Sequence, residues 1–352
     1  MSSSSLLASL AAAIQGFSSP TFSSKGRVPI AKSNFTESAF ESGLASRLDQ
    51  LKSTDEKGYL CIEWLCQAME MVLSTHSSAE VFVQDLQLAV ANGDGRWINS
   101  YLDNTIKLLD TCIILKAAIA EIKSYCGHLT VALRAVEKDS IGEIQLRRCS
   151  KALKNCMDAL KRKDDSVNHL GQRRSKLENC SSMLRRMGER LNTENACKGD
   201  LFMAMYAAQV ITIFVCGLLS SALSFKPRRS LSSICVGGQS SWCFSLSSLQ
   251  QRVKEQVEKK KSRDSNALLE ELDMADIVVR HFHSIVEKGL RGKVYSDKGA
   301  QVLKVKEGAK ILQNLLLDLL QGIPTLESHV ENIYRNLLRS RMVFLDMGLC
   351  SQ

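Results

Sequence analysis

Apolar residues recur every three or four positions along most of this chain, which is the period of an amphipathic α-helix. The first strong stripe follows Gly58 and predicts a helix that runs to about Leu88. Its apolar face holds Leu60, Trp64, Ala68 and Met71. Residues 91–95 read Ala-Asn-Gly-Asp-Gly, a composition typical of a turn, so a second helix is predicted to begin beyond them.

The second predicted helix carries an apolar stripe at nearly heptad spacing, formed by Leu102, Ile106, Leu109, Ile113, Ala117 and Ala120. Two long helices joined by a short turn predict an antiparallel hairpin. The same period predicts further helices over 144–161, 167–191 and 250–286, followed by a Gly-rich break at 289–299. Another helix is then expected to end at Gly322 and Pro324, and a last one to run from Leu326 to about Met347 with Thr325 as its cap.

Strand-like alternation is hard to find anywhere in the chain, so the predicted fold is all-α. We expect an elongated bundle of long antiparallel helices with one uncharged central or membrane-spanning helix at 199–225. Residues 201–225 carry no formal charge and are long enough to cross a hydrocarbon core of about 30 Å. A helix buried on all sides in a bundle fits this stretch equally well, because it also contains Gln209, Thr212 and three serines.

Composition divides the chain into five predicted regions. Residues 1–35 are rich in Ser and Ala, with no acid before Glu37, which fits either an organelle transit peptide or a disordered tail. An N-terminal helical bundle at 36–195 and the apolar helix at 199–225 follow. Residues 226–248 are rich in Ser and Gly and predict a linker. The C-terminal helical region is expected at 249–350.

The composition excludes some classes of protein. With 45% hydrophobic residues and a net charge of +9, the 352-residue chain is not wholly disordered. Twelve dispersed cysteines favour reduced thiols, and their spacing predicts no metal site. There is no Gly-rich phosphate loop and no Gly-x-Ser-x-Gly elbow, so no catalytic residue, cofactor or enzyme activity is predicted. The basic run at 259–263 has acidic neighbours and predicts a solvated helix face, without nucleic-acid binding.

One set of residues resembles a known family. The set consists of Trp64, Gln67, Glu70, His76, Asp85, Trp97, Tyr101, Asp103, Lys107 and Asp110. Their pattern resembles the plant BYPASS family of root-to-shoot growth regulators. A second block, around Lys198-Gly199-Asp200 and Tyr206, looks like the middle region of that family. The resemblance extends from about Thr36 to the C-terminus.

The resemblance implies a non-enzymatic plant protein that is needed for normal root and shoot development and restrains a mobile growth-arresting signal. The residues of the set would then be structural or would dock protein partners, and the family supplies no catalytic residues to carry over. The alternative is a helical enzyme or carrier that holds a small lipophilic, isoprenoid-like compound between its helices. Residues 201–225 and the basic residues that flank them predict a membrane-associated protein, which passes the membrane once if this segment spans it. The N-terminal composition also fits a plastid protein, and a cytoplasmic protein is the alternative.

The predicted linker also contains candidate phosphorylation sites. Arg228 and Arg229 precede Ser230, Ser232 and Ser233, an arrangement that basophilic kinases favour. The same residues resemble the core of a phosphoserine motif that 14-3-3 proteins bind. A flexible Ser-rich linker without modification fits the sequence as well.

Overall fold

A computed structural model describes the chain over residues 30–52, 58–83, 95–137, 141–160, 169–193, 200–224, 231, 233–236, 240–262, 265, 267–291 and 298–349. The chain divides into two units, Met1–Thr36 and Glu37–Gln352. The helical regions expected at 36–195 and 249–350 belong to one unit.

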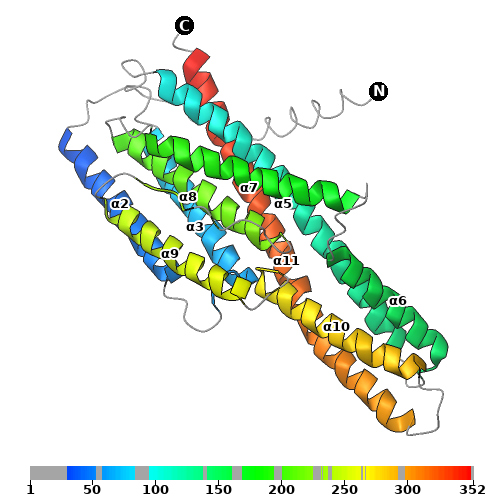
Figure 1. Ribbon diagram of the computed structural model, residues 1–352. Helices are drawn as coiled ribbons and strands as arrows, with labels where there is room; N and C mark the ends of the chain where they lie inside the picture. The colour runs from blue at the N-terminus through cyan, green and yellow to red at the C-terminus, as the bar shows by residue number, and fades with distance from the viewer. Residues whose placement is uncertain are drawn as a thin grey trace, which may run out of the picture. The chain divides into compact units, whose positions relative to one another are not determined.

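The described residues fold into helices, which confirms the all-α prediction. The helices in the first half of the chain are α2 (Ile30–Lys52), α3 (Ile62–Val83), α5 (Gly95–Val136) and α6 (Glu143–Leu160). Those in the second half are α7 (His169–Thr193), α8 (Asp200–Ala222), α9 (Ser241–Ser262), α10 (Glu270–Arg291) and α11 (Lys298–Leu349). Figure 1 shows their arrangement. Helix α3 ends at Val83, and the turn expected at 91–95 lies outside the described residues except for Gly95.

Helix α8 is a core helix of the second unit. It packs against α3, α7 and α5, and 83% of the residues in its most apolar stretch, within Met203–Ala222, are buried. Two of its polar side chains have partners on these neighbours: Oγ1 of Thr212 lies 2.8 Å from Nε2 of His76, and Oγ of Ser220 lies 2.9 Å from Oγ of Ser181. By length and composition alone α8 could cross a membrane, but here neighbouring helices cover its apolar surface.

Helices α5 and α11 are the two longest and run antiparallel along one another. Lys116 of α5 pairs with Glu331 of α11 at 2.6 Å, and Lys123 pairs with Glu327. Beyond this contact, α6 packs on the second half of α5, and α10 packs on both α6 and α11. The two long helices therefore belong both to the group around α8 and to the group formed with α6 and α10 (Figure 1).

The predicted apolar stripe of α5 was wrong. Ile106 and Ile113 are 43% and 56% exposed, and Ala117 and Ala120 are exposed as well. The buried face instead holds Tyr101, Thr105, Leu108, Cys112, Leu115, Ala118, Ile119, Ile122 and Tyr125. Helix α5 has neighbours on several sides, namely α6, α7, α8 and α11. Leu102 and Leu109 of the expected stripe pack against the core, but contacts on several sides, and not apolar spacing alone, decide which face of α5 is buried.

Three predicted boundaries were also wrong. Helix α11 continues through Gly322 and Pro324, because Pro324 lies on the exposed face, where water can bind the carbonyl left without its N–H partner. The helix expected over 250–286 is two helices, α9 and α10, separated at residues 263–269. Helix α9 begins at Ser241, inside the expected linker, where Trp242 and Leu246 enter the core.

Candidate functional site

A tight loop precedes α3 and contacts α9. Its residues Gly58 and Leu60 have positive φ angles of 75° and 68°. A Cβ atom added to Gly58 would lie 2.5 Å from Nε2 of Gln256. Glycine suits the positive φ at this position, and a larger residue would also displace the end of the Gln256 side chain.

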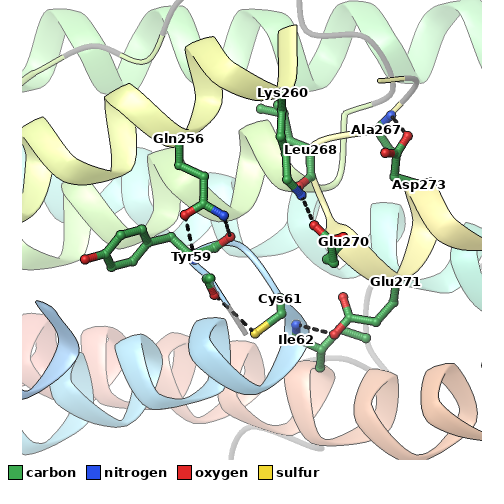
Figure 2. Close-up of polar contacts among 11 residues, drawn as sticks. Tyr59, Cys61, Ile62, Gln256, Lys260, Ala267, Leu268, Glu270, Glu271 and Asp273 are labelled. Atoms are coloured by element: carbon green, nitrogen blue, oxygen red, sulfur yellow. Dashed lines mark hydrogen bonds and ion pairs between the residues drawn. The ribbon is translucent and has the colours of Figure 1, made fainter. Parts of the chain in front are cut away.

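Gln256 of α9 holds this loop through two hydrogen bonds. The backbone N–H of Tyr59 donates to Oε1 of Gln256 at 2.9 Å, and Nε2 of Gln256 donates to the Tyr59 carbonyl at 3.2 Å. Figure 2 shows both bonds between Gln256 and Tyr59. One side chain thus satisfies both backbone polar groups of Tyr59 and fixes α9 to the start of α3.

The start of α10 contributes a carboxylate to the N-terminus of α3. Oε1 of Glu271 accepts the Ile62 N–H at 2.8 Å, and the neighbouring Glu270 N–H donates to the Leu60 carbonyl at 3.2 Å. The other carboxylate oxygen, Oε2 of Glu271, is buried and has no hydrogen-bond partner among the described residues. Desolvation by burial raises the pKa of Glu271, although the Ile62 N–H opposes this.

Lys260 of α9 completes this group of contacts, in contrast to the solvated face expected for residues 259–263. Its side chain is buried, and Lys260 is only 8% exposed. Its Nζ donates to the Leu268 carbonyl at 2.9 Å and forms an ion pair with Glu270. A signal was present in the sequence, because Lys260 continues the apolar spacing of Leu246, Leu249, Val253 and Val257.

An open cleft of about 430 Å³ lies over these contacts. Its walls are Tyr59, Glu270 and the α9 side chains Arg252, Glu255, Gln256, Lys259 and Lys260. We call this surface the α9 cleft. Its charges are mixed, with three basic and two acidic side chains, and the buried Lys260 pairs with the partly exposed Glu270 in its wall. Sequence analysis did not identify these residues as a site, because they come from segments about 200 positions apart.

Two thiols at the start of α3 are not activated. Burial raises the pKa of the Cys61 thiol and raises that of Cys66 to about 11, the opposite of an activated nucleophile. Within the described part of the chain, no group of three or more His, Cys, Asp or Glu side chains is placed to hold a metal ion. The mixed charges suit a polar partner with groups of both signs.

Four of the ten residues that carried the family resemblance make core contacts. Nε1 of Trp64 donates to the Leu51 carbonyl at 3.0 Å. His76 is buried against Thr212 of α8. Trp97 stacks on Tyr101 with ring centroids 5.5 Å apart, and Tyr101 lies 4.8 Å from the ring of Phe344 on α11.

The other residues of the set lie near or at the surface. Gln67, Asp103 and Asp110 are exposed, and Nζ of Lys107 donates to Oδ1 of Asn104 at 3.4 Å. A carboxylate oxygen of Glu70 lies 3.5 Å from Nε2 of His329. Asp85 lies outside the described residues. Because the buried members contact three different elements, the structure does not bring the set together in one site.

Of the candidate phosphorylation sites, Ser233 is exposed, whereas Ser230 and Ser232 lie outside the described residues. Ile234, which follows directly, is buried. Its N–H donates to Oε1 of Gln250 at 2.6 Å, and its carbonyl accepts from Nε2 of the same side chain at 3.2 Å. The residue that follows the last serine is therefore hydrogen-bonded to α9.

Comparison with known proteins agrees with the family resemblance. The family model described as Protein BPS1 matches residues 62–347. Protein BPS1, chloroplastic, from Arabidopsis thaliana is 25% identical over 313 residues, which cover 87% of this chain and 82% of that protein. UPF0496 protein 4 from Oryza sativa subsp. japonica is 27% identical over 251 residues, or 70% of this chain and 53% of that protein.

A more distant relative, Protein ROH1D from Arabidopsis thaliana, is 21% identical over 349 residues, covering 88% of this chain and 87% of that protein. No solved structure matches the chain significantly. None of these relatives is named as an enzyme. Because the family model covers most of the sequence, the chain belongs to the BPS1 family of BYPASS-related plant proteins.

Proposed function

We propose that this protein is a non-enzymatic plant regulator, which supports normal root and shoot development by restraining a mobile growth-arresting signal. The observation that carries the proposal is the family match over residues 62–347. The mixed charges that line the α9 cleft also support a role in binding a polar partner.

Grafting tests the developmental role directly. Roots that lack the gene are grafted onto normal shoots, and normal roots onto shoots that lack it. If the protein restrains a mobile signal made in the root, only the shoots above mutant roots stop growing. Normal growth of those shoots contradicts the proposal.

We propose that the regulator acts through protein partners that bind the α9 cleft. A double variant, Arg252→Glu with Lys259→Glu, reverses the charge of two exposed side chains that line the cleft. The matched control, Lys254→Glu with Arg339→Glu, makes the same charge change at exposed positions elsewhere. Cross-linking and pull-down from plant extract should show partners that the control retains and the cleft variant loses. Equal recovery by both variants excludes the cleft as the docking site.

The alternative function, a carrier or enzyme for a lipophilic compound, would need an apolar cavity. The α9 cleft is lined by polar and charged side chains. A second cleft, of about 510 Å³, is lined by Ser42, Ala45, Ser46, Asp49, Gln50 and Ser241. Neither of these two clefts, both in the described part of the chain, has the apolar walls that such a ligand requires.

We further propose that 14-3-3 proteins bind the chain after phosphorylation of Ser232. Each phosphate adds about −1.5 to −2 charges beside Arg228 and Arg229. Docking of phosphorylated Ser232 in an extended groove requires Ile234, two residues further on, to leave the core and Gln250. Phosphopeptide mapping and 14-3-3 binding to wild-type and Ser232→Ala protein test this, and equal binding by the two proteins excludes it.

We also propose that the protein enters plastids. The support is the Ser- and Ala-rich composition of residues 1–35 and the name of the Arabidopsis relative, which describes that protein as chloroplastic. A fluorescent fusion of the full chain should accumulate in plastids, and one that lacks residues 1–35 should remain in the cytoplasm. Identical distributions contradict the proposal.

A further inference from the structure

The ends of helices α5, α6, α10 and α11 lie close together at one end of the second unit. This end is the one farthest from α8 along α5 and α11. The Cβ position of Gly289, near the end of α10, lies 3.4 Å from Leu146 of α6 and 3.3 Å from Gln301 of α11. Nε2 of Gln301 also donates to the Ile285 carbonyl at 3.0 Å. Helix α5 joins this group because only residues 137–142 separate its end from α6.

We call this surface the distal end and define it as residues 131–137, 143–151, 285–291 and 299–305. Figure 1 shows the ends of α6, α10 and α11 close together at the lower right. The connecting segments 138–140 and 292–297 lie outside the described residues. By sequence they add two lysines and two aspartates, so they leave the net charge of this end unchanged.

The distal end is strongly basic. Its seven basic side chains are all exposed, while it holds only three acidic side chains, Glu137, Glu143 and Glu287. Two ion pairs form, Arg147 with Glu143 at 2.5 Å and Arg291 with Glu287 at 3.7 Å. The other five basic residues have no acidic partner in the described part of the chain, namely Arg134, Arg148, Lys151, Lys288 and Lys304.

The distal end also exposes large aliphatic side chains. Val131 of α5 is 55% exposed, Ile144 of α6 is 65% exposed and Leu303 of α11 is 59% exposed. The basic residues alone would also suit an acidic protein. The exposed aliphatic side chains favour a membrane instead, because their transfer into a hydrocarbon layer is favourable. Basic side chains that surround apolar ones are typical of surfaces at a membrane interface, where phosphate groups meet the cations.

We propose that the distal end docks on an anionic membrane surface. In this arrangement Ile144 and Leu303 enter the acyl boundary, and Arg148, Lys288 and Lys304 contact lipid phosphates. The contact is peripheral and leaves α8 in the core. The proposal does not depend on the developmental role or on the partners of the α9 cleft.

Vesicle sedimentation with the full chain tests the proposal. The vesicles contain phosphatidylcholine alone or phosphatidylcholine with phosphatidylglycerol. The distal variant combines Arg148→Glu, Lys288→Glu and Lys304→Glu. The matched control combines Arg186→Glu, Lys254→Glu and Arg339→Glu, three exposed basic residues outside the distal end with the same total change of charge. Circular dichroism melts verify that both variants fold.

We expect the wild type to bind the anionic vesicles and to be released from them by high salt. The partition coefficient should fall at least about tenfold in the distal variant and stay within about twofold in the control. Ile144→Gln with Leu303→Gln should weaken binding while leaving the charge unchanged. Equal losses in the distal variant and the control overturn the proposal. So does binding to polyglutamate without binding to vesicles, or retention on vesicles after both salt and alkaline carbonate.

Discussion

His76 shows how a single side chain from the family pattern serves the core. The Thr212 hydroxyl donates to the Ala208 carbonyl at 2.7 Å, so its oxygen is free to accept from Nε2–H of His76 at 2.8 Å. This arrangement places a proton on Nε2, and burial of the ring disfavours a second proton on Nδ1. Burial accordingly lowers the pKa of His76 to about 4 from its ordinary value of 6.5.

The shift predicts a loss of stability in mild acid. Between pH 6.5 and 4 the unfolded chain binds a proton at His76 that the folded chain does not, so the free energy of unfolding falls as the pH decreases through this window. The full loss is about 3 kcal/mol. Urea denaturation across the window should show a shallower pH dependence for His76→Gln, whose amide can still donate to Thr212. His281→Gln, an exposed control, should keep the wild-type dependence.

Gln256 gives a second residue-scale prediction. Gln256→Leu removes both bonds to Tyr59 and leaves its partly buried N–H and carbonyl unpaired, which should lower the free energy of unfolding by about 1–3 kcal/mol. Gln251→Leu on the same helix removes only an exposed contact with Glu255 and should change stability by less than about 0.5 kcal/mol. Similar urea midpoints for the two variants would show that the hydrogen bonds between Gln256 and Tyr59 contribute little to stability.

At the scale of elements, close approach decides which glycines are required. A Cβ atom on Gly322 would lie 2.6 Å from Cγ2 of Ile62, whereas one on Gly127 of α5 would meet nothing within 4 Å. Both residues lie within helices. Helix propensity alone would favour alanine at both positions.

The two substitutions should therefore have opposite signs. Gly322→Ala forces α3 away from α11 and should destabilise the fold by about 1–3 kcal/mol. Gly127→Ala should stabilise it by up to about 1 kcal/mol. Thermal melts of the two variants provide the measurement. A rise in Tm for both variants would mean that α3 can shift away from α11 without a loss of stability.

Helix α8 gives the second prediction at this scale. Ile213 is buried in the core, so Ile213→Arg would bury an unpaired charge and should cost at least about 4 kcal/mol. The variant should be insoluble or sensitive to protease, while Ile213→Val should remain folded. Alkaline carbonate should release the wild-type protein from plant membranes. Retention of the wild type in the membrane fraction would show that α8 spans the bilayer.

At the scale of the whole second unit, an aromatic cluster joins elements that are far apart in sequence. Phe344 of α11 lies 4.8 Å from the ring of Tyr101 and 6.1 Å from that of Trp97, both on α5. Next to this cluster, Nη1 of Arg341 donates to the Leu102 carbonyl at 2.6 Å. These contacts fasten the last turns of α11 to the first turns of α5.

Phe344→Ala should therefore destabilise the protein by about 3–5 kcal/mol. Hydrogen exchange should increase at both the start of α5 and the end of α11, because the cluster holds the two together. Phe244→Ala removes an exposed ring on α9 and should leave stability and exchange nearly unchanged. Faster exchange confined to α11 would show that α5 is held by other contacts.

The sequence by itself determined the fold class and most helices, because apolar spacing of three or four reflects burial of one face of each helix. The Gly-rich break before α11 and the helical regions of α6 and α7 followed from the same local signals. The sequence also indicated the family, since Trp64, His76, Trp97 and Tyr101 keep their spacing along α3 and α5. These properties depend on neighbours in the chain.

Only the tertiary structure decided which faces are buried and where a cleft forms. Helix α5 buries Tyr101, Thr105 and Cys112 instead of the more apolar Ile106 and Ile113, because four other helices contact it. Lys260 is buried because Glu270 and the Leu268 carbonyl meet its ammonium group. The α9 cleft likewise requires Tyr59 and Gln256 to meet across 197 positions of sequence. Such partners come from distant segments, and no local pattern records them.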